Sequence, residues 1–241
     1  MSVHDRYKMF QADQREFFDA LITEDWSTYV SKDWDLSRRF EVSQLFSRIQ
    51  PKTILDVGCG CGFHDLEMAQ YPFVEQVEAI DYSAKSIERA NKEYPHPKVS
   101  RCKADLGNFQ PQKTYELVVS FQVFEHLDKP EAYLQLCRRV CGGNGRIAIF
   151  TPNRRRLRNV LRGLRGLPPE LCDPQHFKEY TALEISGMGR ECGLKLDDWF
   201  GTGLDGFGWL SRQPMARRLK FGASIPWLAN GICVVMKPDT A

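Results

Sequence analysis

Hydrophobic and polar positions alternate in two different ways along this chain. After residue 50, short runs rich in aliphatic and β-branched residues are separated by segments in which apolar positions recur every three or four residues. The first pattern predicts buried strands and the second predicts helices. The predicted strands cover residues 53–57, 76–80, 99–102, 117–120, 146–150, 194–200 and 231–236, and the predicted helices cover residues 63–70, 84–94, 130–140 and 181–191.

Strands that alternate with helices of this length indicate βαβ units and a parallel sheet. We therefore expect a Rossmann-like α/β fold, with a seven-stranded, mainly parallel sheet and helices on both faces. Residues 1–50 show helical spacing that stops at Pro51, which predicts an N-terminal helical cap. A turn is expected at residues 142–145, where three glycines surround an asparagine before the fifth strand.

Composition narrows the class of protein without identifying it. The 241 residues include 33 Lys and Arg against 31 Asp and Glu, and 42% are hydrophobic, as in globular proteins. This near balance of charge gives no sequence-wide preference for nucleic acid. No apolar segment has the length of a membrane span or of a signal peptide, and the eight cysteines form no Cys-x-x-Cys pair. We therefore expect a cytoplasmic protein with reduced thiols.

The most informative segment follows the first predicted strand. It reads Asp56-Val-Gly58-Cys-Gly60-Cys-Gly62 and leads into a helix. Alternating glycines let a ligand approach the backbone closely at a helix N-terminus. A dinucleotide-binding loop would place its last glycine at position 63, which is Phe63, so an NAD-linked dehydrogenase is disfavoured.

This segment resembles the first motif of the class I S-adenosylmethionine-dependent methyltransferases. Asp81-Tyr82 is similar to the family's second motif, an acidic strand end whose carboxylate can accept hydrogen bonds from ribose hydroxyls. Asp105-Leu106 is similar to the third motif, which frames the adenine. The resemblance covers about residues 50–200 and implies S-adenosylmethionine as cofactor. The residues implied to bind it are Asp56, Gly58, Cys59, Gly60, Gly62, Asp81, Tyr82, Asp105, Leu106 and Phe121.

A second resemblance lies after the fourth predicted strand. Glu125-His126 looks like the Glu-His pair of ubiquinone-biosynthesis O-methyltransferases. Some of those enzymes, and small-RNA 2′-O-methyltransferases, carry Glu-x-x-Glu-His with a distant His and bind a divalent metal. Here the first position is Gln122, and His176 is the candidate distant ligand. A neutral amide in place of a carboxylate should weaken a metal site.

Two interpretations of this cluster stay open. In the first, His126 acts as a general base or orients the acceptor, while Glu125 and His176 complete the catalytic pocket. In the second, Glu125, His126, His176 and Gln122 hold a divalent metal that helps a hydroxyl to ionise. An inert structural histidine is the plain alternative to both.

A concentrated basic segment follows the fifth predicted strand. Its apolar residues Leu157, Val160, Leu161 and Leu164 predict a short amphipathic helix. Three partners compete for this segment: an anionic membrane surface, a phosphate-bearing or otherwise acidic substrate, and nucleic acid. Nucleic acid is disfavoured because no aromatic-rich basic module accompanies the arginines. A solvated helix is the plain alternative. The arginines concerned are Arg154, Arg155, Arg156, Arg158, Arg162 and Arg165.

These observations together predict an enzyme that transfers a methyl group from S-adenosylmethionine to a small-molecule oxygen. Methylation of an amine is the nearest alternative, and a non-catalytic cofactor-binding or partner-binding protein is the alternative of another class. A single domain over residues 1–241 is expected. If the basic segment binds lipid, the protein would also associate with the surface of a membrane. We divide it into a helical cap (1–50), a cofactor-binding core (51–151), a basic insertion (152–180) and a C-terminal sheet with the acceptor-pocket region (181–241).

Overall fold

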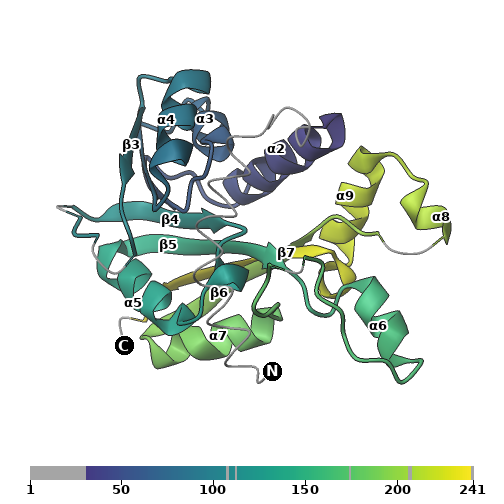
Figure 1. Cartoon of the computed structure of the whole chain (residues 1–241). Coiled ribbons are helices and arrows are strands. Elements are labelled where there is room, and N and C mark those ends of the chain that lie inside the picture. The colour runs from purple at the N-terminus through teal and green to yellow at the C-terminus, as the bar shows by residue number, and fades with distance from the viewer. Residues whose placement is uncertain (1–30, 107–108, 112, 174, 206–207, 240–241) are drawn as a thin grey trace.

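The structure is a computed structural model, and it describes residues 31–106, 109–111, 113–173, 175–205 and 208–239. A seven-stranded sheet forms its centre, in the order β3-β2-β1-β4-β5-β7-β6 (Figure 1). The strands are β1 (Thr53–Val57), β2 (Gln76–Asp81), β3 (Val99–Lys103), β4 (Tyr115–Phe121), β5 (Cys141–Pro152), β6 (Leu194–Thr202) and β7 (Gly231–Pro238). The predicted Rossmann-like, seven-stranded sheet is therefore confirmed.

Parallel pairing dominates this sheet. β1 pairs in parallel with β2 and β4, β2 with β3, and β4 with β5, whereas β7 is antiparallel to both β5 and β6. The chain builds β1, β2 and β3 in one direction and then returns to add β4 on the other side of β1. At such a reversal the loops that leave the two strands diverge, which opens a crevice at their carboxyl ends.

Helices cover both faces of the sheet, as predicted (Figure 1). Val42, Leu45 and Met68 from one group of helices pack with the side chains of one face. Tyr133 and Ile185 from the other group belong to the cluster on the opposite face. The helices are α2 (Lys32–Phe46), α3 (Phe63–Ala69), α4 (Ala84–Glu93), α5 (Pro130–Val140), α6 (Leu157–Gly163), α7 (Ala182–Glu191), α8 (Gly208–Ser211) and α9 (Met215–Ser224), with short 3-10 turns η2 (Phe124–His126) and η3 (Pro226–Leu228).

Part of the predicted N-terminal cap lies outside the described residues, and α2 is the part that can be compared. Its N-cap is Ser31, whose side chain accepts a hydrogen bond from the Trp34 amide. The helix contacts α3, which follows β1, and also α9 and β6 from the C-terminal part of the chain. It therefore connects early and late segments of the described chain. Residues 1–30, where more of the cap was expected, are not among those that the structure describes.

One local expectation is wrong. The predicted turn at residues 142–145 belongs to β5, where a Cβ on Gly145 would lie 2.8 Å from the Tyr115 carbonyl oxygen. Glycine is therefore needed for close strand contact there, and pairing with β4 is irregular at this point. The predicted basic helix is confirmed as α6, which ends at Gly163, and α9 lies in the connection between β6 and β7.

Candidate active site at the carboxyl edge of the sheet

The glycine loop lies where β1 ends, at the reversal point of the sheet. Gly58, Gly60 and Gly62 have φ angles of 79°, 53° and 81°, a region that residues with a Cβ rarely adopt. The Gly58 amide donates a hydrogen bond to the Ile80 carbonyl oxygen at 2.8 Å. A Cβ on Gly58 would lie 2.5 Å from Cγ2 of Val123, so this loop runs tightly against the segment after β4.

Asp81 ends β2 and ties the glycine loop to the next helix. Its carboxylate accepts hydrogen bonds from the Gly60 amide at 2.9 Å and from the Ser83 amide at 2.8 Å, and the residue is only 8% exposed. Ser83 is the N-cap of α4. An acidic group fixed at this edge has the position expected of an acceptor for ribose hydroxyls, and its contact with a cofactor stays a prediction.

Asp56 is buried beneath the loop instead of lying on its surface. Burial, followed by the nearby carboxylates of Asp65 and Asp81, raises the pKa of Asp56 well above its usual range. Asp65 in turn forms a buried ion pair with Arg101, with 2.7 Å between Oδ2 and Nε. Sequence reasoning missed this pair because the two residues are 36 positions apart and belong to no recognised motif.

The other predicted cofactor residues lie at or just after the carboxyl ends of β1, β2, β3 and β4. Phe121, at the end of β4, stacks on the His64 ring with 3.7 Å between centroids. Cys59 is buried, Tyr82 is half-buried and Asp105 is exposed. Leu106 packs at the edge of the core. These placements are compatible with a cofactor site, and each residue's contact with the cofactor remains a prediction.

Glu125, His126 and His176 converge, as the resemblance implies. One ligand atom from each lies within 4.8 Å of the others. His176 Nε2 is 3.9 Å from Glu125 Oε1, and the two imidazole centroids are 4.9 Å apart. Thr151 donates a hydrogen bond to Glu125 Oε2 at 2.9 Å, while Glu125 Oε1 is buried and has no hydrogen-bond partner among the described residues.

Both imidazoles are oriented through Nδ1. His126 Nδ1 lies 3.2 Å from the Gln175 carbonyl oxygen, and His176 Nδ1 lies 3.2 Å from Glu179 Oε1. Because each of these oxygens can only accept, each neutral ring carries its proton on Nδ1 and its lone pair on Nε2. This is the arrangement that metal-binding histidines usually show, with the second nitrogen held by a carbonyl or carboxylate.

Glu179 is a site residue that the sequence did not reveal. It is 1% exposed and accepts hydrogen bonds from the Cys172 amide at 2.6 Å and from Arg156. Burial alone would raise the pKa of Glu179, but hydrogen bonds from His176, Cys172 and Arg156 lower it to about 2. The ionised carboxylate therefore fixes the His176 ring.

The electrostatics of the cluster favour neutral groups. Burial, with a smaller effect of His176, lowers the pKa of His126 to about 4. Burial raises the pKa of Glu125 to about 7. Desolvation, followed by Glu179, raises the pKa of the neighbouring Cys172 thiol to about 12. At neutral pH the His126 ring is therefore neutral, and Cys172 is an un-ionised thiol.

Gln122 marks the junction of β4 with this cluster. Its φ of 57° lies in the left-handed region, which is uncommon for a residue with a side chain and often accompanies functional sites. Its amide donates a hydrogen bond to the Phe150 carbonyl oxygen at 2.9 Å. Whether its side chain joins a metal site stays a prediction.

The basic segment is more fully paired than its sequence suggests. Arg156 is 6% exposed and forms a buried ion pair with Glu179, so its expected role on an outward surface is wrong. Arg158 and Arg162 both pair with Glu170, and Arg154 pairs with Glu184. Exposed Arg155 and Arg165 complete the run. Within the described residues, no helix has the length and apolarity needed to cross a membrane.

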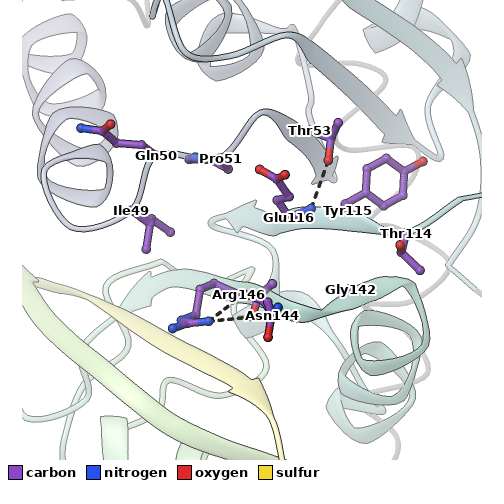
Figure 2. Close-up of a pocket in the computed structure, with 11 residues that line it drawn as sticks. Ile49, Gln50, Pro51, Thr53, Thr114, Tyr115, Glu116, Gly142, Asn144 and Arg146 are labelled. Carbon is purple, nitrogen blue, oxygen red and sulfur yellow. Dashed lines mark hydrogen bonds between the residues drawn. The ribbon is translucent and has the colours of Figure 1, made fainter.

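Two pockets lie at opposite edges of the sheet. One, of about 520 Å³, is lined by the amino ends of β1, β4 and β5 and includes Thr53, Glu116 and Arg146 (Figure 2). It is on the edge opposite the glycine loop. The other, of about 710 Å³, includes Gln122 and Cys172 and therefore adjoins the histidine cluster.

Comparisons with known proteins agree with this geometry. A sequence model of a methyltransferase-domain family matches residues 35–198. A Mycobacterium tuberculosis protein named as a probable S-adenosylmethionine-dependent methyltransferase is 32% identical over 166 residues, which cover 68% of this chain and 57% of that protein. The ubiquinone biosynthesis O-methyltransferase of Rickettsia conorii is 28% identical over 144 residues, or 59% of this chain and 48% of that protein. The chain thus matches about half of the length of these relatives.

A solved structure shows the same fold at low sequence identity. The magnesium protoporphyrin IX methyltransferase of Synechocystis, with bound S-adenosylhomocysteine, aligns with a TM-score of 0.65 and 14% identity over 94% of this chain and 98% of that chain. Strand order, glycine loop and acidic strand end define the class, a Rossmann-like methyltransferase fold. The chain belongs to the methyltransferase-domain family whose relatives depend on S-adenosylmethionine.

Proposed function

We propose that this chain transfers the methyl group of S-adenosylmethionine to a hydroxyl of a small-molecule acceptor. The observation that carries the proposal is the convergence of Glu125, His126 and His176 beside the end of β4. The neighbouring Val123 is in van der Waals reach of the glycine loop, so cofactor and acceptor groups would meet there. The names of the relatives support methyl transfer, and the ubiquinone relative supports oxygen as the acceptor atom.

The sulfonium already activates the methyl group, so the protein's task is alignment and proton removal. The acceptor oxygen forms a bond to the methyl carbon, and the carbon–sulfur bond breaks with its electron pair on sulfur. The hydroxyl proton passes to Nε2 of His126, whose ring is neutral at pH 7; the lowered pKa also makes this ring a weaker base than an exposed imidazole. Glu125 and His176 form the rest of the polar surface around this step.

The same three side chains fit a divalent metal. The donor set is of the two-histidine, one-carboxylate type. It combines two imidazoles whose Nδ1 atoms already have hydrogen-bond partners with a buried carboxylate oxygen that has no partner among the described residues. Glu125, His126 and His176 would hold the ion, with Gln122 as a neutral fourth candidate. When bound, such an ion would supply Lewis-acid stabilisation of an ionised acceptor oxygen.

The arginine segment supports a smaller role than its sequence indicates. Arg155 and Arg165 are the arginines of this segment that are exposed and form no ion pair with an acid among the described residues, whereas Arg154, Arg158 and Arg162 pair with acids. Cosedimentation with anionic vesicles tests the membrane interpretation. Equal recovery with neutral and anionic vesicles would exclude it.

The proposal is tested in two stages. Calorimetric titration with S-adenosylhomocysteine should show stoichiometric binding, and its absence would exclude a methyltransferase. Release of S-adenosylhomocysteine is then measured with a panel of phenols and a matched panel of anilines. Turnover confined to the anilines would overturn the assignment of oxygen. Chelator treatment followed by addition of Mn²⁺ or Zn²⁺ separates the metal from His126 acting alone, because only the metal-dependent reaction is lost and restored.

A further inference from the structure

The ring of His176 lies between two groups of possible metal ligands. Its Nε2 atom is on the side of Glu125 and His126, the cluster to which the proposed function assigns the acceptor chemistry. Its Nδ1 atom is on the side of Cys172 and Glu179. Cys172 has no part in the proposed function, although a thiol, an imidazole and a carboxylate are all common ligands of zinc.

The spacing of the second group is that of zinc ligands. Cys172 Sγ is 3.7 Å from His176 Nδ1, and His176 Nδ1 is 3.2 Å from Glu179 Oε1. Around a tetrahedral Zn²⁺, with bonds of about 2.3 Å to sulfur and about 2.0–2.2 Å to nitrogen and oxygen, a sulfur and a nitrogen ligand lie about 3.5 Å apart and a nitrogen and an oxygen ligand about 3.4 Å apart. One ligand atom from each of the three residues lies within 4.8 Å of the others, so all three can meet at a single ion.

The carboxylate of this group is held in place, while the thiol is accessible. Glu179 is buried, Arg156 pairs with its Oε2 atom, and the Cys172 amide donates a hydrogen bond to its Oε1 atom at 2.6 Å. Hydrogen bonds of this kind orient a ligating carboxylate toward a metal. Cys172 is exposed and lines the pocket of about 710 Å³. The three side chains therefore have both an orienting shell and an entry path for an ion.

We propose that Cys172, Glu179 and Nδ1 of His176 form a binding site for Zn²⁺ or another thiophilic divalent ion, separate from the cluster at the end of β4. A thiolate ligand favours such ions over Mn²⁺ or Mg²⁺. Zn²⁺ replaces the thiol proton, which is released to solvent, because a coordinating thiol is deprotonated. The imidazole keeps its single proton, which moves from Nδ1 to Nε2.

Occupation of this site changes the opposite side of the His176 ring. A neutral imidazole has one proton and one lone pair, so an ion on Nδ1 leaves Nε2 as a donor. Nε2 can then no longer hold an ion together with Glu125 and His126, and the two metal sites exclude each other. Zn²⁺ at the new site should therefore inhibit a metal-dependent methyl transfer, and only this consequence rests on the proposed function.

The experiment titrates the chelator-treated protein with Cd²⁺ as a spectroscopic substitute for Zn²⁺. Cd²⁺ bound to a thiolate absorbs in the ultraviolet by charge transfer, whereas the cluster at the end of β4 contains no thiol. One equivalent should produce this band in the wild type, and Cys172→Ser should lose it. Because Cys172 is exposed, the variant should fold as the wild type does.

Cys102→Ser is the matched control, because it changes another exposed cysteine, on β3, and it should keep the band at full intensity. Absence of the band in the wild type, or a band that survives in Cys172→Ser, would overturn the proposal.

Nuclear magnetic resonance identifies the nitrogen that binds the ion. With ¹⁵N-labelled histidine and ¹¹³Cd²⁺, the His176 ring should show cadmium coupling at Nδ1 and a bonded proton at Nε2. His126→Asn, which disrupts the other cluster, should leave this coupling and the ultraviolet band unchanged. Coupling at Nε2, or loss of the band in His126→Asn, would place the ion with Glu125 and overturn the proposal.

The outcomes separate this inference from the proposed function, because none of the measurements requires methyl transfer. If S-adenosylhomocysteine does not bind but the Cys172-dependent band appears, the methyltransferase proposal fails and the zinc site stands. If S-adenosylhomocysteine binds and that band is absent, the zinc site is wrong while the methyltransferase remains.

Discussion

The two halves of the proposed active site, one assigned to the cofactor and the other to the acceptor, are formed by different kinds of groups. The cofactor half, at the ends of β1 and β2, consists of backbone: glycines at positive φ, and amides that Asp81 accepts from within a short stretch of sequence. The acceptor half consists of side chains brought together from distant segments, such as Glu125 with His176 and Arg156 with Glu179. Substitutions that add atoms to the glycine loop should therefore disturb the first half. Substitutions that change polar side chains should disturb the second half.

Gly58→Ala should give the largest effect on stability. The new Cβ would lie 2.5 Å from Val123 Cγ2 and would force alanine into a left-handed conformation. Left-handed strain costs about 1–2 kcal/mol and overpacking about 1–3 kcal/mol, so we expect a loss of about 2–5 kcal/mol in unfolding free energy. Urea denaturation measures it, and calorimetry should show that binding of S-adenosylhomocysteine is lost.

Gly60→Ala is the matched control for that substitution. Apart from its chain neighbours, no described residue has an atom within 4 Å of a Cβ at Gly60, although φ is also positive at 53°. Only the conformational cost of about 1–2 kcal/mol should remain. Equal losses for Gly58→Ala and Gly60→Ala would mean that close packing against Val123 does not define the cofactor half.

His176→Asn should separate the two halves most clearly. Removing one of the two imidazoles from the cluster should weaken Co²⁺ binding by more than about 100-fold, which exceeds the effect of losing a residue that only orients a ligand. Co²⁺ binding is measured by its visible absorption. Affinity for S-adenosylhomocysteine should stay within about twofold because the glycine loop is untouched. His96→Asn, in a histidine outside the cluster, should leave both values unchanged. Unaltered Co²⁺ affinity in His176→Asn would exclude His176 from the proposed metal site.

The cofactor half is easier to predict from the sequence than the acceptor half, because its residues are close together in the chain. The glycine loop and the acid at Asp81 are local patterns, so their positions follow from strand and helix periodicity. His176 was found only through resemblance to a family. Arg156 stands in a run of arginines that reads as a solvated helix face, and nothing local indicates that Glu179, 23 residues later, removes it from solvent. The buried pair of Asp65 and Arg101 is a further example.

Glu179→Gln tests the orientation of His176 with a smaller expected effect. The amide can present a donor to Nδ1, which would favour the tautomer with the lone pair in the wrong place. Loss of an outer-shell partner lowers metal affinity by about 10–100-fold, so Co²⁺ binding should weaken within that range. Glu170→Gln, an exposed acid that pairs with Arg158 and Arg162, is the control and should change Co²⁺ binding little. Full affinity in Glu179→Gln would show that His176 needs no such partner.

The smallest expected effect is on the pH dependence of stability in the metal-free wild-type protein, where two opposite contributions meet. Glu125 has a folded pKa of about 7 against an ordinary 4.5, so its contribution to stability is complete below pH 4.5 and is lost as pH rises to 7. His126 has a folded pKa of about 4 against 6.5, so its contribution is complete above pH 6.5 and is lost as pH falls to 4. Between pH 4.5 and 6.5 the two contributions oppose each other and nearly cancel.

Single substitutions should expose each slope in turn. In Glu125→Gln the histidine contribution stands alone, so unfolding free energy should fall, relative to wild type, as pH decreases from 6.5 to 4.5. In His126→Asn the opposite slope should appear, with stability increasing over the same range. Each slope is at most about 1.4 kcal/mol per pH unit, the linkage value for one proton. Urea titrations in chelator at several pH values measure them. Parallel curves for both variants and wild type would show that neither group titrates differently on folding, and that the acceptor half is less buried than its contacts indicate.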